Sequence, residues 1–244
     1  MSHAPSSDIA IRLAPHHDAR AYAEVFRKFG RLHIPNLLAD ADARRIFDAL
    51  TTRTPWRLML IHDGPKEITQ EAWAATPPEQ RAKIESEVME AAKVRFEGRF
   101  CALRFSDDGE IYQGDPPELV ALSRFLNTDP FLSFVRTITG AADIALADAQ
   151  ATLYRPGDFL HRHNDVFAGK NRVAAYVYNL TPRWMVEWGG VLAFIDQDGH
   201  IAEGYSPVWN ALNILKVPQV HYVSCVAPFA PEGRYSVTGW LRRR

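Results

Sequence analysis

The stretch YRPGDFLHRHND, from Tyr154 to Asp165, carries the signals that decide the fold. Two short segments rich in aromatic and aliphatic residues flank a Pro-Gly pair, and this composition is typical of two strands joined by a turn. The second segment ends in His163 and Asp165. Because side chains at positions i and i+2 of an extended chain project to the same face, both can point into one cavity. The stretch therefore predicts a strand that leads into a possible metal site.

The same strand-and-turn texture continues through the C-terminal part of the chain. Turn residues such as Pro-Gly, Gly-Gly and Asp-Gly recur at intervals of about ten residues, which is the spacing of a β-sandwich or barrel. The segments between them are rich in β-branched and aromatic residues: DAQATLYRPG, DFLHRH, RVAAYVYNL, GGVLAFIDQDG, NALNILKV, HYVSCVAPF and RYSVTGWLRR. They predict a β core over about residues 148–242.

The N-terminal part shows helical periodicity instead, and we expect it to support the β core over about residues 21–140. The expected helices cover residues 21–29 with Gly30 as the stop, residues 40–50 with Asp40 as the N-cap, residues 76–98 with Thr76 as the cap and Gly98 as the stop, residues 118–126, and residues 130–139. The first 20 or so residues are expected to be loose. We interpret residues 1–244 as a single domain that is mainly β with N-terminal helices.

Composition narrows the class of protein. The chain has 244 residues, 47% of them hydrophobic, and a formal net charge of −1, which is typical of a globular protein and gives no reason to expect a nucleic-acid partner. No apolar run is long enough for a signal peptide or a membrane span. Only Cys101 and Cys225 are present, without a CxxC pair, so neither a disulfide framework nor a thiolate zinc site is indicated. We expect a cytoplasmic location and no membrane contact.

A third candidate ligand completes the possible metal site. His221 opens a later strand, and two imidazoles with one carboxylate form the facial triad of non-haem Fe(II) oxygenases. The alternative is that His163 and Asp165 are only a hydrogen-bonded polar pair at a strand end. A second such motif, His16 to Asp18, has no strand before it, and we interpret it as a solvated surface feature.

The triad raises the question of a co-substrate. If the co-substrate is 2-oxoglutarate, its distal carboxylate needs a fixed cation, and the planar fork of an arginine meets a carboxylate best. Arg234 begins the strand RYSVTGW and is the candidate. Trp240, at the end of that strand, is expected to pack in the core, and the terminal Arg-Arg-Arg to be a solvated tail.

Taken in order, these motifs resemble the prolyl 4-hydroxylase-like branch of the 2-oxoglutarate and Fe(II)-dependent dioxygenases. The matching text is YRPGDFLHRHND, RVAAYVYNLTPRWMVEWGGVLAF, WNALNILKVPQVHYVSCV and RYSVTGWLR, over roughly residues 148–242. FRKFGRLHIPNLLADADARRIFDAL also looks like the helix-strand-helix start of the family, whereas residues 57–147 match nothing. The resemblance implies a double-stranded β-helix, a cupin-like jelly roll.

The resemblance also implies roles for particular residues. His163, Asp165 and His221 would bind Fe(II), and Arg234 would pair with the distal carboxylate of 2-oxoglutarate. Tyr154 would line the co-substrate pocket, Arg172 would meet the substrate at the pocket mouth, and either Tyr178 or Asn179 would contact the co-substrate. His161, on the same face as His163, is a candidate for supporting the site. Tyr154 and Tyr178 can equally be core aromatic residues.

The implied reaction couples decarboxylation of 2-oxoglutarate to hydroxylation of an unactivated carbon, with dioxygen as oxidant and ascorbate as reductant. We favour a prolyl residue in a peptide or protein as substrate, with the loop 166–171 as a movable lid. The alternatives are a hydroxylase of a free amino acid or another small molecule, and a non-catalytic jelly-roll protein that binds a metal or ligand. Nucleic-acid dealkylation is disfavoured because Trp240 stands where that branch has a second arginine, and halogenation because Asp165 occupies the position a halide would need.

Overall fold

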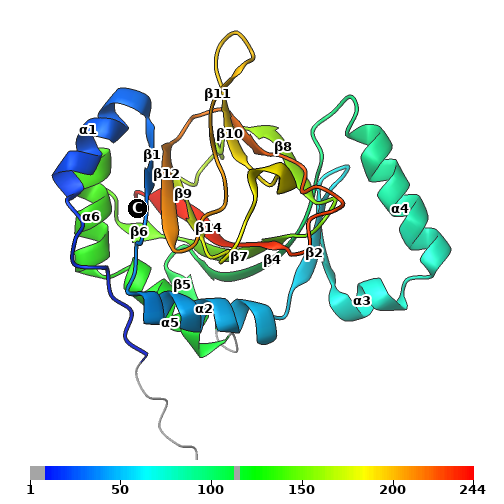
Figure 1. The fold of residues 1–244 in the computed structure, drawn as a ribbon, viewed down its shortest axis with the longest axis horizontal. Coiled ribbons are helices and arrows are strands. Elements are labelled where there is room, and N and C mark those ends of the chain that lie inside the picture. The colour runs from blue at the N-terminus through cyan, green and yellow to red at the C-terminus, as the bar shows by residue number, and fades with distance from the viewer. Residues whose placement is uncertain (1–8, 113–115) are drawn as a thin grey trace, which may run out of the picture.

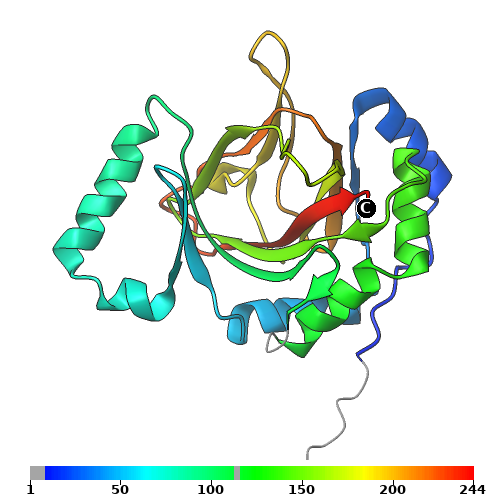
Figure 2. The same cartoon turned by 180° about the vertical axis from the view of Figure 1, so that it is seen from behind.

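The computed structural model describes residues 9–112 and 116–244. Its centre is an antiparallel sheet that curls into a nearly closed barrel, with the strand order β1-β12-β9-β14-β7-β4-β8-β13-β10-β11 (Figure 1). Helices α1 and α6 pack together on one flank, and α3 and α4 lie on the opposite flank (Figures 1 and 2). The prediction of a mainly β jelly roll with N-terminal helices is confirmed. No helix in the described part of the chain is long and apolar enough to cross a membrane.

The strands of the C-terminal core follow the predicted segments closely. They are β6 (Leu146–Ala147), β7 (Ala149–Tyr154), β8 (Phe159–His163), β9 (Arg172–Asn179), β10 (Leu192–Ile195), β11 (Ile201–Tyr205), β12 (Ala211–Lys216), β13 (His221–Val223) and β14 (Arg234–Arg242). A 3-10 turn, η1 (Val186–Trp188), precedes β10. Of these strands, β11 was not expected as a separate element. It pairs with β10 as a hairpin that projects from the barrel (Figure 1).

The helices that cover the barrel also lie near their predicted positions. They are α1 (Ala19–Phe29), α2 (Asp40–Thr52), α5 (Pro117–Leu126) and α6 (Asp129–Thr139). Strand β1 (Arg31–Ile34) follows α1 in the chain, precedes α2 and pairs with β12. Gly30 ends α1 in the left-handed conformation, as expected. The N-cap expected at Asp40 is wrong, because Asp40 already lies in the first turn and its carboxylate accepts from Arg44 and Trp209 instead.

Residues 57–111 differ most from the expected helical support. They form β2 (Arg57–Ile61), β3 (Pro65–Thr69), α3 (Gln70–Ala75), α4 (Pro78–Ala91), β4 (Gly98–Asp107) and β5 (Glu110–Ile111). Thr76 follows α3 and donates its hydroxyl to Ala72 rather than capping α4. Strand β4 pairs with both β7 and β8 and so belongs to the barrel itself.

Gly98 has a different role from the one expected. It begins β4 instead of ending a helix, and it is paired with Leu160 of β8. A Cβ atom at this position would lie 2.7 Å from the Leu160 Cδ1 atom. The absence of a side chain therefore lets the two strands approach closely, which is a common use of glycine inside a sheet.

Both ends of the chain are more firmly held than expected, as far as they are described. Residues 1–8 lie outside the described part, but Leu13 bridges Leu38, and His17 contacts the Leu37 carbonyl oxygen at 3.0 Å. Asp18 is the N-cap of α1, and His16 and Asp18 are both exposed, as expected of a solvated surface feature. Arg242 is buried at 5% exposure and donates to Asp148, so it is not part of a solvated tail.

Two apolar regions fix which face of each strand meets the site. The larger core lies between the sheet and the helices and takes in Tyr176 and Tyr178 of β9. Ala175 and Val177, on the opposite face of the same strand, pack with Phe194 inside the barrel. The alternation along β9 thus separates side chains that support the fold from side chains that line the interior.

Candidate metal centre and co-substrate pocket

Three potential metal ligands meet at the open end of the barrel. His163 ends β8, and His221 begins β13 directly opposite it in the antiparallel pair. Asp165 lies two residues beyond β8, and its Oδ1 and Oδ2 atoms are 3.8 Å from His163 Nε2 and 3.4 Å from His221 Nε2. One donor atom from each residue lies within 4.8 Å of the other two. This spacing and donor set fit a single metal ion with three protein ligands.

Backbone carbonyl groups orient both histidine rings. His163 Nδ1 lies 2.9 Å from the His161 carbonyl oxygen, and His221 Nδ1 lies 2.8 Å from that of Gln219. A carbonyl oxygen only accepts, so each Nδ1 donates and each Nε2 keeps its lone pair for a metal. Burial, together with the neighbouring His163, lowers the pKa of His221, which favours the neutral ring that a metal requires.

Asp165 reaches the site by a different backbone path from the one expected. The extended chain ends at His163, and Asp165 has a φ of 62°, in the left-handed region. Aspartate is one of the few residues other than glycine that enters this region readily. The turn, rather than a continuous strand, therefore brings the carboxylate to the same cavity as the two imidazoles.

His161 supports the site through its main chain and not through its ring. The His161 Nδ1 atom lies 3.0 Å from the carbonyl oxygen of Arg95 and 3.3 Å from the amide nitrogen of Glu97, away from the metal ligands. Its amide also donates to the Glu97 carbonyl oxygen. The loop before β4 thus fixes the segment whose carbonyl orients His163. Backbone contacts of this kind have no side-chain signature in a sequence.

Behind the three ligands lies a cavity of about 90 Å³ inside the barrel. Because one ordered water needs about 10–15 Å³ on this measure, the cavity has room for a small organic anion. Gln150, Thr152 and Tyr154 line it from alternate positions of β7, while Leu192 and Leu215 are among its apolar walls. Gln150 and Thr152 were not predicted to line the cavity, although they lie at every second position before Tyr154 and should therefore point to the same face of the strand.

Arg234 lies in this cavity, at the start of β14, and is 1% exposed. Within residues 9–112 and 116–244, no side chain or carbonyl group accepts a hydrogen bond from its guanidinium group, and its buried Nε has no partner. Burial lowers the pKa of Arg234. A buried cation without a counter-ion is costly, so the site suits a ligand that brings its own negative charge. The residues present therefore fit both a metal ion and a carboxylate co-substrate.

The aromatic and amide candidates divide between the two faces of the sheet. Tyr154 is buried in the cavity, with its ring 5.1 Å from that of Phe100 and 5.2 Å from the Arg234 guanidinium carbon. Tyr178 instead donates its hydroxyl to Asn210 Oδ1 at 2.8 Å in the core under the helices. Asn179 is buried on the inward face of β9, and its Oδ1 atom has no hydrogen-bond partner in the part of the chain that the structure describes. Of the two open candidates, Asn179 is therefore the one that faces the interior.

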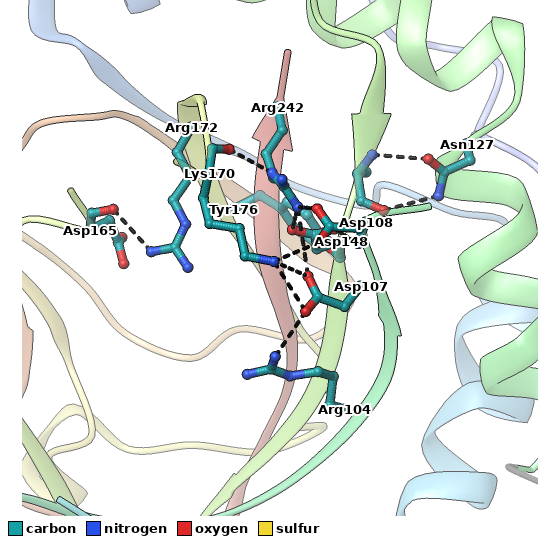
Figure 3. Close-up of polar contacts among 11 residues, drawn as sticks. Arg104, Asp107, Asp108, Asn127, Asp148, Asp165, Lys170, Arg172, Tyr176 and Arg242 are labelled. Atoms are coloured by element: carbon teal, nitrogen blue, oxygen red, sulfur yellow. Dashed lines mark hydrogen bonds and ion pairs between the residues drawn. The ribbon is translucent and has the colours of Figure 1, made fainter. Parts of the chain in front are cut away.

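Arg172 lies beside the ligands, at the start of β9. Its Nη1 donates to the Asp165 carbonyl oxygen at 3.0 Å (Figure 3). Its guanidinium carbon lies 3.5 Å from the ring centroid of Trp240. Trp240, which was expected to be simple core packing, lines the cavity, and its buried Nε1 has no partner in the described residues. The structure thus brings Arg172 to the site but occupies its side chain with protein groups.

The site opens to the surface next to His163. A recess of about 350 Å³ is lined there by Phe96, Arg162, His163, Asn164 and Val220. The ring centroids of Phe96 and His163 are 6.3 Å apart. Phe96 and Val220 are both exposed apolar side chains, so the mouth of the site has a partly apolar rim.

Comparison with known proteins agrees with this geometry. Residues 149–242 match the sequence model of the 2OG-Fe(II) oxygenase superfamily. The chain is similar to prolyl 3-hydroxylase OGFOD1 of Mus musculus, with 27% identity over 144 residues, which is 57% of this chain and 26% of that protein. It is also similar to prolyl 3,4-dihydroxylase OGFOD1 of Ostreococcus tauri, with 26% identity over 139 residues, which is 52% of this chain and 27% of that protein. The matched part is thus about a quarter of the length of these relatives.

Solved structures show the same fold over nearly the whole chain. A prolyl-4-hydroxylase of Pseudomonas putida superposes with a TM-score of 0.56 and 20% identity over 93% of this chain and 100% of that one. A 2OG-Fe(II) oxygenase-family oxidoreductase of Burkholderia pseudomallei superposes with a TM-score of 0.61 and 16% identity over 98% of this chain and 100% of that one. Residues 149–242 are therefore similar to the 2OG-Fe(II) oxygenase superfamily, and the chain shares its fold with these solved structures.

Proposed function

We propose that the protein is a 2-oxoglutarate- and Fe(II)-dependent dioxygenase that hydroxylates a prolyl residue in a peptide or protein. The observation that carries this proposal is Arg234. A buried guanidinium group, which has no counter-ion among the residues that the structure describes, lies in the same cavity as two histidines and one aspartate arranged for one metal ion. A protein that only bound a metal would have no need of this uncompensated cation.

Each group in the site has a distinct part in the proposed reaction. His163, Asp165 and His221 would hold Fe(II) and leave its other positions open. Arg234 would hold the distal carboxylate of 2-oxoglutarate with its planar fork, and Tyr154 would line the same pocket. Fe(II), with 2-oxoglutarate and dioxygen, would supply the oxidation: 2-oxoglutarate would lose carbon dioxide and gain one oxygen atom to become succinate, and the other oxygen atom would become the hydroxyl group on the substrate carbon.

The protein contributes orientation and exclusion of water. The two Nδ1 contacts to backbone carbonyls fix the imidazole rings before a metal binds. Apolar side chains such as Leu192 and Leu215 wall the pocket. Because the pocket is small and shielded from water, the attraction between Arg234 and a carboxylate is stronger there than at the protein surface.

The shape of the mouth supports a polypeptide substrate over a free amino acid. The recess beside His163 is open to solvent and is larger than the inner cavity. Its rim carries exposed apolar side chains, including Phe96 and Val220, which suit the ring of a prolyl residue. It offers no enclosed set of charges for the amino and carboxylate groups of a free amino acid.

The test is 2-oxoglutarate turnover with Fe(II), screened against proline-containing peptides and against free amino acids. We expect a proline-containing peptide to stimulate succinate release and to gain one oxygen on proline, as measured by mass spectrometry. Asp165→Ala is the inactive control. If free amino acids stimulate turnover and no peptide does, the polypeptide substrate is wrong and the small-molecule alternative takes its place.

Ascorbate as reductant and a cytoplasmic location are further parts of this proposal. Cys101 and Cys225 are both free thiols, which suits a reducing compartment. Ascorbate would maintain the iron in the reduced state, and its omission is expected to shorten the period of linear turnover without changing the initial rate.

A further inference from the structure

The segment from Asn164 to Asn171, which we call the strap, joins β8 to β9 and carries the metal ligand Asp165. Its residues 166–171 were expected to form a movable lid. The contacts at its two ends describe a different device, in which the strap is tied to the barrel (Figure 3). The argument rests on the proposed metal site.

Arg172 holds one end of the strap. Its Nη1 donates to the Asp165 carbonyl oxygen at 3.0 Å, while the faces of its guanidinium group meet aromatic rings. The guanidinium carbon is 3.5 Å from the Trp240 ring centroid and 5.4 Å from that of Phe167. The planar guanidinium group can stack on a ring with its face and donate to a carbonyl with its edge at the same time.

No carboxylate competes for this guanidinium group within the described residues. Every ion pair near it belongs to other cations, and its own Nε is buried without a partner. Among the described residues, the hydrogen bond to the Asp165 carbonyl oxygen is therefore the polar contact that orients the Arg172 side chain. A side chain held in this way is poorly placed to reach out to a substrate.

The carbonyl that Arg172 binds belongs to a residue with an unusual backbone. Asp165 has a φ of 62°, and its carboxylate reaches the metal site only because of this turn. Outside the glycines, such a conformation persists when its surroundings hold it in place. Fixing the carbonyl oxygen restricts rotation of the Asp165 peptide and so fixes the direction of its side chain.

Ion pairs of Lys170 tie the other end of the strap to the end of β4, and a hydrogen bond to its carbonyl group ties it to β14. The Lys170 Nζ atom lies 3.1 Å from Asp107 Oδ1 and 2.7 Å from Asp108 Oδ2. Arg242 Nε donates to the Lys170 carbonyl oxygen at 2.6 Å, and Arg242 Nη1 lies 2.9 Å from Asp148 Oδ2 (Figure 3).

Main-chain contacts continue this attachment to the start of β9. The Asn171 carbonyl oxygen accepts from the Arg243 amide at 3.1 Å. The two residues directly before Arg172 are therefore bound to the body of the protein, and the base of the arginine side chain is fixed with them.

We propose that Arg172 is a positioning residue for the metal ligand Asp165, and that the anchored strap maintains it in register between Trp240 and Phe167. On this proposal Arg172 acts on metal affinity and not on substrate binding. Loss of a group that orients a metal ligand commonly weakens metal affinity by about 10- to 100-fold.

The test is titration of the full-length protein with Mn(II) by isothermal titration calorimetry, without 2-oxoglutarate or substrate. Arg172→Met keeps a long apolar side chain between the rings and removes the hydrogen bond, so we expect about tenfold weaker Mn(II) binding. Arg172→Lys should be intermediate, because an ammonium group can donate but cannot stack as a plane. Arg183→Met, at an exposed arginine, is the matched control and should bind as the wild type does.

A second readout separates positioning from substrate contact. With saturating Fe(II), the KM for a stimulating peptide should be unchanged in Arg172→Lys, whereas a substrate-binding arginine would raise it. Trp240→Phe keeps a ring under the guanidinium group and should retain most of the Mn(II) affinity, which provides a variant that does not depend on Arg172→Met folding.

The outcomes distinguish this proposal from the one it rests on. If the wild type binds Mn(II), Asp165→Ala does not, and both Arg172 variants bind as tightly as the wild type, the metal site stands and the positioning role is overturned. If the wild type binds no Mn(II), or Asp165→Ala binds as well as the wild type, the metal site itself is wrong and the positioning role falls with it.

Discussion

Arg234 allows the sharpest prediction, because it is charged, 1% exposed and without a protein partner in the described part of the chain. Arg234→Ala would leave the distal carboxylate of 2-oxoglutarate unpaired in a small cavity. Breaking a buried, hydrogen-bonded charge pair costs about 2 to 5 kcal/mol. At about 1.4 kcal/mol for each tenfold change, the dissociation constant of 2-oxoglutarate should rise about 30-fold to about 4,000-fold.

The assay is calorimetric titration of 2-oxoglutarate into Mn(II)-loaded protein, in wild type and variants. Arg234→Lys should restore only part of the affinity, because an ammonium group lacks the fork that meets both carboxylate oxygens. Mn(II) affinity itself should not change, since Arg234 contacts none of His163, Asp165 and His221. If Arg234→Ala weakens 2-oxoglutarate less than about fivefold, which is under about 1 kcal/mol, the carboxylate is held elsewhere.

The Arg234 side chain should favour 2-oxoglutarate binding but lower the stability of the ligand-free protein. A buried charge without a partner opposes folding, and an apolar side chain of similar length removes that cost. Arg234→Met should therefore melt at the same temperature as the ligand-free wild type or above it, while losing the stabilisation that 2-oxoglutarate gives the wild type. A markedly lower melting temperature for ligand-free Arg234→Met would show that the guanidinium group supports the fold.

Three further predictions address the ligands, the inward face of β9 and the packing of β14. His163→Ala, Asp165→Ala and His221→Ala should each abolish Mn(II) binding in calorimetry, whereas His16→Ala should leave it unchanged; retained binding in Asp165→Ala would refute the ligand set. Tyr178→Phe should leave 2-oxoglutarate affinity unchanged and Asn179→Ala should weaken it, and the reverse result would place Tyr178 at the co-substrate. Gly239→Ala should lower the free energy of unfolding by about 3 kcal/mol or more in urea titration, because its Cβ would lie 1.8 Å from the Asp148 carbonyl oxygen. Gly109→Ala, with no atom in contact, should cost about 1 to 2 kcal/mol for its backbone alone, and an equal loss at both positions would contradict the packing argument.

The jelly-roll strands and the grouping of His163, Asp165 and His221 could be predicted because their signals are local. Alternation with a period of two and turn pairs such as Pro156-Gly157 mark strands within a few residues. The ligand residues carry their chemistry in side chains, so His163 and Asp165 are visible as a spacing. His221 could be added because it opens a recognisable strand.

In the region from 57 to 111, a helix was expected over residues 76–98 and α4 lies within it, but the strands could not be predicted because they are set by distant partners. Strand β4 is buried along most of its length and forms pairs with β7 and β8, which follow it in the chain. A buried run of this kind lacks clear alternation, and Gly98 has the composition of a helix stop. Only the close approach to Leu160 explains why glycine stands there.

The error at the C-terminus has a related origin. Arg242 looked like part of a solvated basic tail, but it is buried and donates to Asp148 and to the Lys170 carbonyl group. The contact of Arg172 with Trp240 was likewise not foreseen, while its contact with the substrate stays a prediction. In both cases a partner of the side chain lies far away in the sequence.

The most direct test of the central claim is to follow oxygen from ¹⁸O₂ into succinate. Purified protein would be incubated with Fe(II), 2-oxoglutarate and labelled dioxygen, and the succinate analysed by mass spectrometry beside Asp165→Ala. If the three ligands and Arg234 form a dioxygenase site, succinate should carry a single labelled oxygen in the wild type and should not form in the variant. Absence of succinate in the wild type, or succinate without label, would contradict the account.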